Sequence, residues 1–165
     1  MFESTTNVFD KANIDSAINY IYQSDKYQFC VTGAYGIGKS YLLNQLKQRD
    51  DSAIFIDVNL SNESWSSDIK KAIRDITTGQ QNAHYLLLDL SMNPFSMLGY
   101  SDGVYEKYVY PFAKVCRKFG CKLVITLYPS ELEFGQPKVS SVFDIINLGK
   151  IEDTQEVQEM DFIFL

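Results

Sequence analysis

Apolar residues recur at helical spacing in four stretches of the chain. Asn13 stands before the first stretch and Ser66 or Ser67 before the third, where helix N-caps are expected. Pro111 must start or kink the fourth helix, because proline lacks a backbone N–H, and Gly120 is placed to end that helix. The inward-facing side chains of the four predicted helices are Ile14, Ala17, Ile18 and Ile21; Leu42, Leu43 and Leu46; Ile69, Ala72, Ile73 and Ile76; and Tyr105, Tyr108, Phe112, Val115 and Phe119.

Short apolar runs separate these helices. Runs with almost no polar interruption are typical of strands that are covered on both faces. Because strands and helices alternate along the chain, the pattern predicts an α/β fold with a mainly parallel five-stranded sheet between layers of helices. We expect a single domain over residues 1–165, a length that suits one core. The expected strands are residues 27–32, 53–58, 85–89, 122–127 and 143–148.

Two segments do not follow this alternation. Residues 92–103 are rich in Pro, Gly, Ser and Asn, which predicts a loop. Residues 152–165 fit either an acidic turn followed by a sixth strand over 161–165, or one helix with its apolar residues facing inward. The sequence leaves these two alternatives open.

The charge of the chain restricts its direct partners. Fifteen basic and 21 acidic residues give a net charge of −6 at pH 7. No broad basic face is then available to follow a phosphate backbone, so we do not expect this chain to bind nucleic acid directly.

Apolar runs and cysteines indicate the cellular compartment that we expect for the protein. No apolar run approaches the roughly 20 residues of a spanning helix, and residues 1–10 lack the basic-then-apolar order of a secretory signal. Cys30, Cys116 and Cys121 are odd in number and lack the paired spacing of a zinc site, so we expect reduced thiols in or near the core. These features predict a cytoplasmic protein without a membrane anchor.

One motif carries most of the chemistry. Residues 33–40 read Gly-Ala-Tyr-Gly-Ile-Gly-Lys-Ser and match G-x-x-x-x-G-K-[ST], the phosphate-binding loop or Walker A motif, between a predicted strand and a predicted helix. Glycines let successive backbone N–H groups point at phosphates, and the helix N-terminus adds its positive end. Lys39 supplies a cation for the β- and γ-phosphate oxygens, and the Ser40 hydroxyl can bind Mg²⁺. The expected nucleotide-contacting residues are Gly33, Ala34, Tyr35, Gly36, Ile37, Gly38, Lys39, Ser40 and Tyr41.

A carboxylate completes the predicted metal site. Asp89 ends the apolar run Leu-Leu-Leu-Asp, at the carboxyl end of a strand, where ligands bind in open α/β sheets. We expect this Walker B aspartate and Ser40 to hold Mg²⁺, and the cofactors to be ATP and Mg²⁺.

Together these residues resemble the AAA+ and related STAND ATPases. The resemblance begins with the predicted helix that leads into FCVTGAYGIGKS. It continues through AIFIDVNL, HYLLLDLS, CKLVITLYP and VFDIINLGKI, which covers most of the chain. It implies a three-layer P-loop NTPase fold with sheet order 5-1-4-3-2, and the core domain alone, without a helical lid. It also places Thr126 near the γ-phosphate as a sensor residue, although an ordinary β-branched strand residue fits that position equally well.

The sequence departs from this family at the residues for hydrolysis. The family's glutamate after the metal aspartate is replaced by Leu90, and Asn59 stands where recombinase-type relatives carry one. An amide can orient a water but cannot take its proton, so Asn59 is at most a water-holding residue. Asp57 and Glu63 remain as candidate bases, neither at a position that the motif defines.

An arginine finger is also hard to identify. The chain has three arginines, Arg49, Arg74 and Arg117, and each lies on a predicted helix or its edge. Because such a finger contributes on the order of 10³ or more to the rate, we expect slow hydrolysis by this chain alone.

Three functions follow from these residues. The first is a slow ATPase or ATP-operated switch that acts with a protein partner or as a homo-oligomer. The second is a nucleotide-stabilised interaction module without hydrolysis, and the third is a small-molecule kinase, which the shortage of arginines disfavours. The guanine-reading motif [NT]-K-x-D is absent from the sequence, which favours adenine, and His84 is expected to be a surface residue at a strand end.

Overall fold

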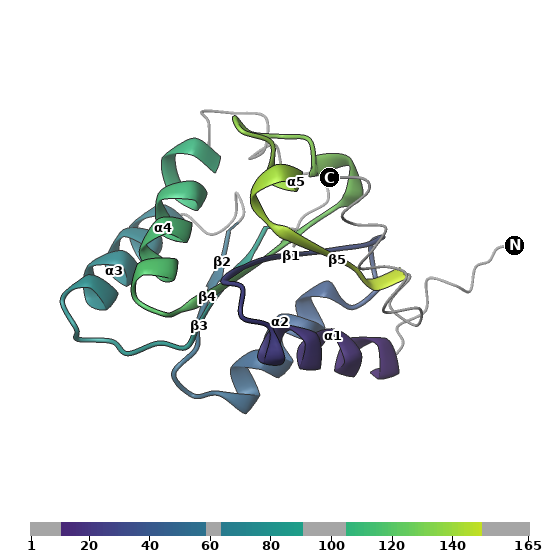
Figure 1. Cartoon of the computed structure of the whole chain (residues 1–165), viewed down its shortest axis with the longest axis horizontal. Coiled ribbons are helices and arrows are strands. Elements are labelled where there is room, and N and C mark those ends of the chain that lie inside the picture. The colour runs from purple at the N-terminus through teal and green to yellow at the C-terminus, as the bar shows by residue number, and fades with distance from the viewer. Residues whose placement is uncertain (1–10, 59–63, 91–104, 150–165) are drawn as a thin grey trace, which may run out of the picture.

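Five parallel strands form the centre of the molecule (Figure 1). The structure is a computed structural model that describes residues 11–58, 64–90 and 105–149. The sheet order is β2-β3-β4-β1-β5, which is the predicted order 5-1-4-3-2 read from the other edge, and every strand pair is parallel. The α/β prediction is therefore confirmed. The strands are β1 (Gln28–Thr32), β2 (Ile54–Asp57), β3 (Tyr85–Asp89), β4 (Lys122–Leu127) and β5 (Asp144–Asn147).

Helices cover both faces of the sheet. In Figure 1, α1 (Lys11–Gln23) and α2 (Lys39–Arg49) lie on one face, and α3 (Trp65–Thr77) and α4 (Tyr110–Lys118) lie on the other. Strand side chains alternate between two buried clusters, because successive residues of a strand point to opposite faces. For example, Phe29 packs with the α1/α2 side and Cys30 with the α3/α4 side. All three cysteines are buried free thiols, as predicted.

Two predicted helix starts are wrong. Lys11 and Ala12 already belong to α1, so Asn13 lies inside that helix and does not cap it. Ser64 occupies the N-cap position of α3, and Ser67 lies in its first turn with its hydroxyl donating back to Ser64 O at 2.9 Å. Several polar residues precede each apolar pattern, so the pattern alone does not determine which of them begins the helix.

The fourth helix begins and ends at the predicted signals. Pro111 lies in the first turn of α4, which follows a π-helical turn at Tyr105–Val109. Gly120 has a φ of +75° directly after the helix, and Cys121 N donates to Cys116 O at 2.8 Å, which closes the last turn. Phe119, predicted to face inward, is 43% exposed because the helix has ended before it. A short helix α5 (Val139–Val142) precedes β5. The predicted loop at 92–103 and the two alternatives for 152–165 lie outside the described residues.

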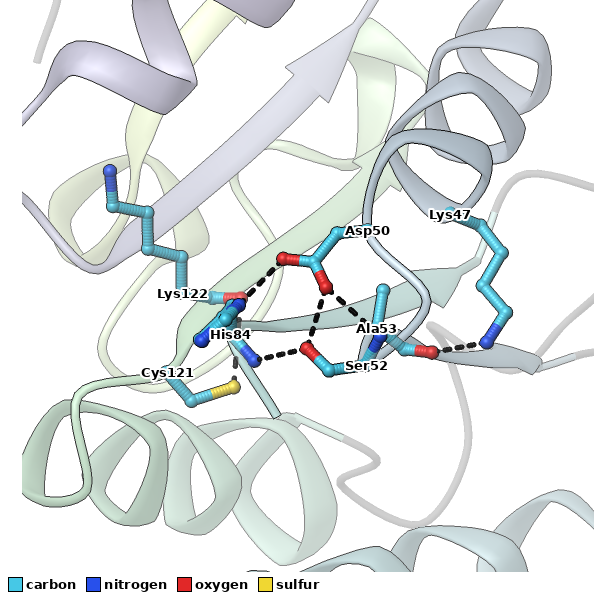
Figure 2. Close-up of polar contacts among 7 residues, drawn as sticks. All are labelled: Lys47, Asp50, Ser52, Ala53, His84, Cys121 and Lys122. Atoms are coloured by element: carbon cyan, nitrogen blue, oxygen red, sulfur yellow. Dashed lines mark hydrogen bonds and ion pairs between the residues drawn. The ribbon is translucent and has the colours of Figure 1, made fainter. Parts of the chain in front are cut away.

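Polar contacts join the turn after α2 to the start of β3 (Figure 2). Asp50 Oδ1 accepts hydrogen bonds from the backbone N–H and hydroxyl of Ser52, and Asp50 Oδ2 lies 2.7 Å from His84 Nδ1. Partial burial opposes ionisation, but the bonds from Ser52 and His84 prevail and lower the pKa of Asp50. The His84 side chain is 64% exposed, so it is the strand-end surface residue that was expected.

Lys122 connects β4 to the end of α1. Its Nζ donates to Ile21 O at 2.7 Å, Tyr22 O at 3.1 Å and Ser24 O at 2.8 Å. The last carbonyls of a helix lack helical partners, and a cation there also stabilises the helix dipole. This one side chain therefore fixes the carboxyl end of α1 against the sheet.

We expect Lys122→Met to lower the free energy of unfolding by about 1–3 kcal/mol, because three carbonyls lose a charged donor while the apolar stem is kept. Urea denaturation measures this difference. The control is Lys114→Met, an exposed lysine on α4. Equal unfolding midpoints for the two variants would show that Lys122 does not stabilise this end of α1.

Candidate functional site

A glycine loop, residues 33–38, joins β1 to α2 at the carboxyl edge of the sheet. Gly33, Gly36 and Gly38 have φ values of +153°, +84° and +113°, which residues with side chains rarely adopt. A Cβ on Gly33 would lie 2.8 Å from Ile37 Cγ2, so the loop can close on its buried Ile37 only with glycine there. By contrast, a Cβ on Gly36 would meet nothing within 4 Å, so the loop is open to ligands on that side.

The start of α2 adds to this loop. Leu42 N donates to Gly38 O at 2.9 Å, so the N–H groups of Lys39, Ser40 and Tyr41 come before this hydrogen bond. These groups form the positive end of the helix, which attracts anions. Tyr35, within the loop, is 70% exposed.

Lys39 folds over the loop that precedes it. Its Nζ donates to Gly33 O at 2.8 Å and to Ala34 O at 2.9 Å, and the side chain is almost fully buried. The same nitrogen lies 4.4 Å from the centre of the Tyr128 ring. Burial lowers the pKa of Lys39 to about 8, although the negative charges of Asp89 and Glu131 oppose this shift. The cation is thus held at the glycine loop.

Asp89 is fixed by hydroxyls from two neighbouring elements. Ser40 Oγ donates to Asp89 Oδ2 at 2.7 Å, and Thr126 Oγ1 donates to Asp89 Oδ1 at 2.8 Å. Leu90 N donates to Thr126 Oγ1 at 3.1 Å, which orients the hydroxyl. Asp89 and Thr126 are paired in the β3–β4 register and both are fully buried. Thr126 is therefore a positioning residue for Asp89 and more than a β-branched strand residue.

The oxygens of Ser40 and Asp89 suit a hard divalent cation. A hydroxyl and a carboxylate converge at the end of α2 beside the glycine loop, and Mg²⁺ prefers such oxygens. Among the described residues, no group of three or more His, Cys, Asp or Glu side chains could hold a metal. Mg²⁺ commonly uses one or two protein oxygens, with waters and phosphates as its other ligands, so the donor set fits this ion.

The structure brings Lys39, Ser40, Asp89 and Thr126 together, but not every predicted residue. Asn59 and the candidate base Glu63 lie outside the described residues. Asp57 is paired with Asp89 in the β2–β3 register, and Leu90 is buried in the α3/α4 cluster.

The three arginines do not join this group. Arg49, Arg74 and Arg117 lie in the last turns of α2, α3 and α4. These helices return the chain toward the amino ends of the strands, so the arginines lie at the opposite edge of the sheet from the glycine loop. Arg49 Nη2 lies 3.3 Å from Asp15 Oδ1 on α1.

Tyr128 and Glu131, which the sequence interpretation missed, also lie at this edge. They belong to a tight turn after β4 that ends in the 3-10 segment Pro129–Glu131. Tyr128 N donates to Glu131 Oε1 at 2.8 Å, and Glu131 N donates to Tyr128 O at 2.9 Å. Burial raises the pKa of the Glu131 carboxyl, and the Tyr128 N–H and Lys39 only partly offset this. The available signal was a glutamate three residues after Tyr128, the residue that follows the strand, with Pro129 between them.

No helix in the described part of the chain is long and apolar enough to cross a membrane. No protein-family model matches the chain, and no curated protein matches it either, so its function has to be inferred from residues and geometry.

Proposed function

We propose that this protein is a P-loop NTPase-like protein that binds ATP with Mg²⁺ through residues 33–40. The observation that supports it best is the 2.7 Å contact between Ser40 Oγ and Asp89 Oδ2, directly beside a glycine loop that opens a helix. A phosphate loop and a metal-binding carboxylate are separate sequence signals. Their meeting at one edge of a parallel sheet is what this class of site requires.

Each residue then has a defined task. The loop N–H groups and the start of α2 bind phosphate oxygens, and Lys39 neutralises charge at the β- and γ-phosphates. Ser40 and Asp89 would hold Mg²⁺, which would supply positive charge to offset the negative charge of the phosphates. Thr126 keeps the Asp89 carboxylate turned toward Ser40 by its own 2.8 Å hydrogen bond.

The protein acts as a slow ATPase or ATP-operated switch with a protein partner or with further copies of itself. The slow rate follows from the position of the arginines, which lie at the edge of the sheet away from Lys39 and cannot neutralise transition-state charge within one chain. Bound nucleotide would change the contacts of Asp89 and Thr126 at this edge of the sheet and so change the surface offered to a partner.

Calorimetry with Mg·ATP and Mg·GTP, with phosphate release followed in the same samples, tests this function. We expect one Mg·ATP per chain, weaker binding of Mg·GTP, and slow release of phosphate. Binding without any release would favour the nucleotide-stabilised interaction module. A chain that binds neither nucleotide would refute the proposed function.

A further inference from the structure

A second carboxylate, Glu131, lies in the turn after β4, next to residues that pack on the face of the sheet opposite to α2. Asp89 accepts from Ser40 of α2, which covers one face, whereas Leu132 and Phe134, just after Glu131, pack on the α3/α4 cluster. The turn that carries Glu131 is tied to Lys39 by the Tyr128 ring, 4.4 Å from Nζ. The negative charges of Asp89 and Glu131 both act on Lys39, and Asp89 accepts a hydrogen bond from Ser40.

The position of this turn is set by the sheet. β4 lies between β3, which ends at Asp89, and β1, which leads into the glycine loop. Leu127, the last residue of β4, is paired with Thr32, the residue before Gly33. A turn that begins directly after Leu127 is thus held next to the loop at its β1 end.

We propose that Glu131 is the general base for ATP hydrolysis, which takes a proton from the attacking water. This inference rests on the proposed function. One carboxylate oxygen of Glu131 already accepts the Tyr128 N–H at 2.8 Å, so the other is the proton acceptor. Leu90 follows Asp89 and lies on the same face, but its side chain cannot accept a proton. A carboxylate from the turn after β4 would supply the proton acceptor that is missing there.

The step balances with water as the only co-reactant. The water oxygen forms a bond to the γ-phosphorus while its proton passes to the Glu131 carboxylate. The bond from the γ-phosphorus to the bridging oxygen breaks, and its electron pair stays on the β-phosphate of ADP, beside the Lys39 cation. Glu131 then returns the proton to solvent.

The surroundings of Glu131 suit a carboxylate that accepts a proton. Lys39 is the group whose charge acts on the Glu131 carboxyl. Tyr128, Tyr105 and Cys30 are titratable groups on which the charge of Glu131 acts. Burial raises the pKa of the Tyr105, Tyr128 and Cys30 groups, so these stay uncharged and Lys39 is the neighbouring charge. Burial also raises the pKa of Glu131 itself, which strengthens it as a proton acceptor once it has ionised.

The test compares wild type with Glu131→Gln in Mg·ATP calorimetry and single-turnover phosphate release. Glutamine keeps an oxygen for the Tyr128 N–H, so the turn and the binding site are preserved. We expect the dissociation constant to stay within about threefold and the hydrolysis rate to fall about 100-fold or more, the usual contribution of a general base. The matched control is Glu133→Gln: Glu133 is 62% exposed, pairs with Lys138 at 2.9 Å and should be dispensable.

Two further readouts separate a base from a residue that only supports the turn. The wild-type rate should rise with pH through the pKa of Glu131, because the base must be ionised, and Glu131→Gln should lose this rise. Added formate should restore part of the rate in Glu131→Ala, since it can supply a carboxylate in place of the missing side chain.

Three results would overturn the assignment. One is a Glu131→Gln rate close to that of wild type, and another is a loss of binding equal to the loss of rate, which would make Glu131 a support for Lys39. The third is a wild type that binds Mg·ATP but releases no phosphate, which refutes the base and leaves the proposed nucleotide binding intact. A wild type that binds no nucleotide refutes the proposed function itself.

Discussion

Replacing Lys39 with alanine should weaken Mg·ATP binding by on the order of 30- to 4,000-fold. The Lys39 nitrogen is almost fully buried and is held over the glycine loop by two carbonyls. In such a site, removal of one partner of a charged hydrogen-bonded pair costs about 2–5 kcal/mol. Each 1.4 kcal/mol corresponds to about a tenfold change in affinity, which gives the expected range.

Calorimetric titration of wild type and Lys39→Ala measures this loss. Lys39→Met is a second variant, which keeps the apolar stem against the Tyr128 ring and removes only the charge. The control is Lys70→Ala, an exposed lysine on α3, which should bind as wild type does. If Lys39→Met and Lys70→Ala bound Mg·ATP equally well, residues 33–40 would not be the phosphate site.

Much of the fold could be predicted from the apolar pattern. β3 and β4 begin and end where predicted, because β3 is buried throughout and β4 is buried at every residue after Lys122. The sheet order was predicted from the family resemblance, because periodicity alone does not order parallel strands. The structure confirms that order. The inward residues of α1 were also predicted, because its apolar spacing fits one helical face.

The surroundings of Asp89 could be predicted only in part. The glycine motif and the strand-ending aspartate pointed separately to Ser40 and Asp89, and the structure shows that they are in contact. The role of Thr126 was undecided, because a threonine in a strand has the same pattern whether its hydroxyl faces a carboxylate or a neighbouring side chain. Its 2.8 Å bond to Asp89 depends on the β3–β4 register, which a single sequence does not contain.

Glu131 was missed for a related reason. The resemblance places a catalytic glutamate after β2 or β3, and the turn after β4 is not among these positions. The contact that makes Glu131 relevant runs from Lys39 through the ring of Tyr128 to the turn after β4, across residues far apart in the sequence. Leu90, which follows β3, carries no carboxylate, but the turn after the neighbouring strand can supply one. Only the sheet order shows that this neighbour is β4.

Asp89→Asn should remove most of the advantage that Mg²⁺ gives to ATP binding. In wild type the fully buried carboxylate lies 2.7 Å from Ser40 Oγ, so a cation at this point meets a full negative charge that is shielded from water. Asparagine has nearly the same shape, but it carries no charge and offers one oxygen. Deleting one member of a buried charge pair costs about 2–5 kcal/mol. We therefore expect Mg·ATP affinity to fall by about 100-fold.

The measurement is a pair of titrations, ATP with Mg²⁺ and ATP with EDTA, for wild type, Asp89→Asn and the control Asp51→Asn. Asp51 is exposed in the turn after α2, so its variant should keep the wild-type ratio of the two affinities. In Asp89→Asn the ratio should approach one, while affinity in EDTA stays the same or improves, since a negative charge near the phosphates is gone. An equal loss in both titrations would mean that Asp89 supports the loop without binding the metal. A ratio unchanged from wild type would place the metal elsewhere, and Ser40 and Asp89 would then form a structural hydrogen bond only.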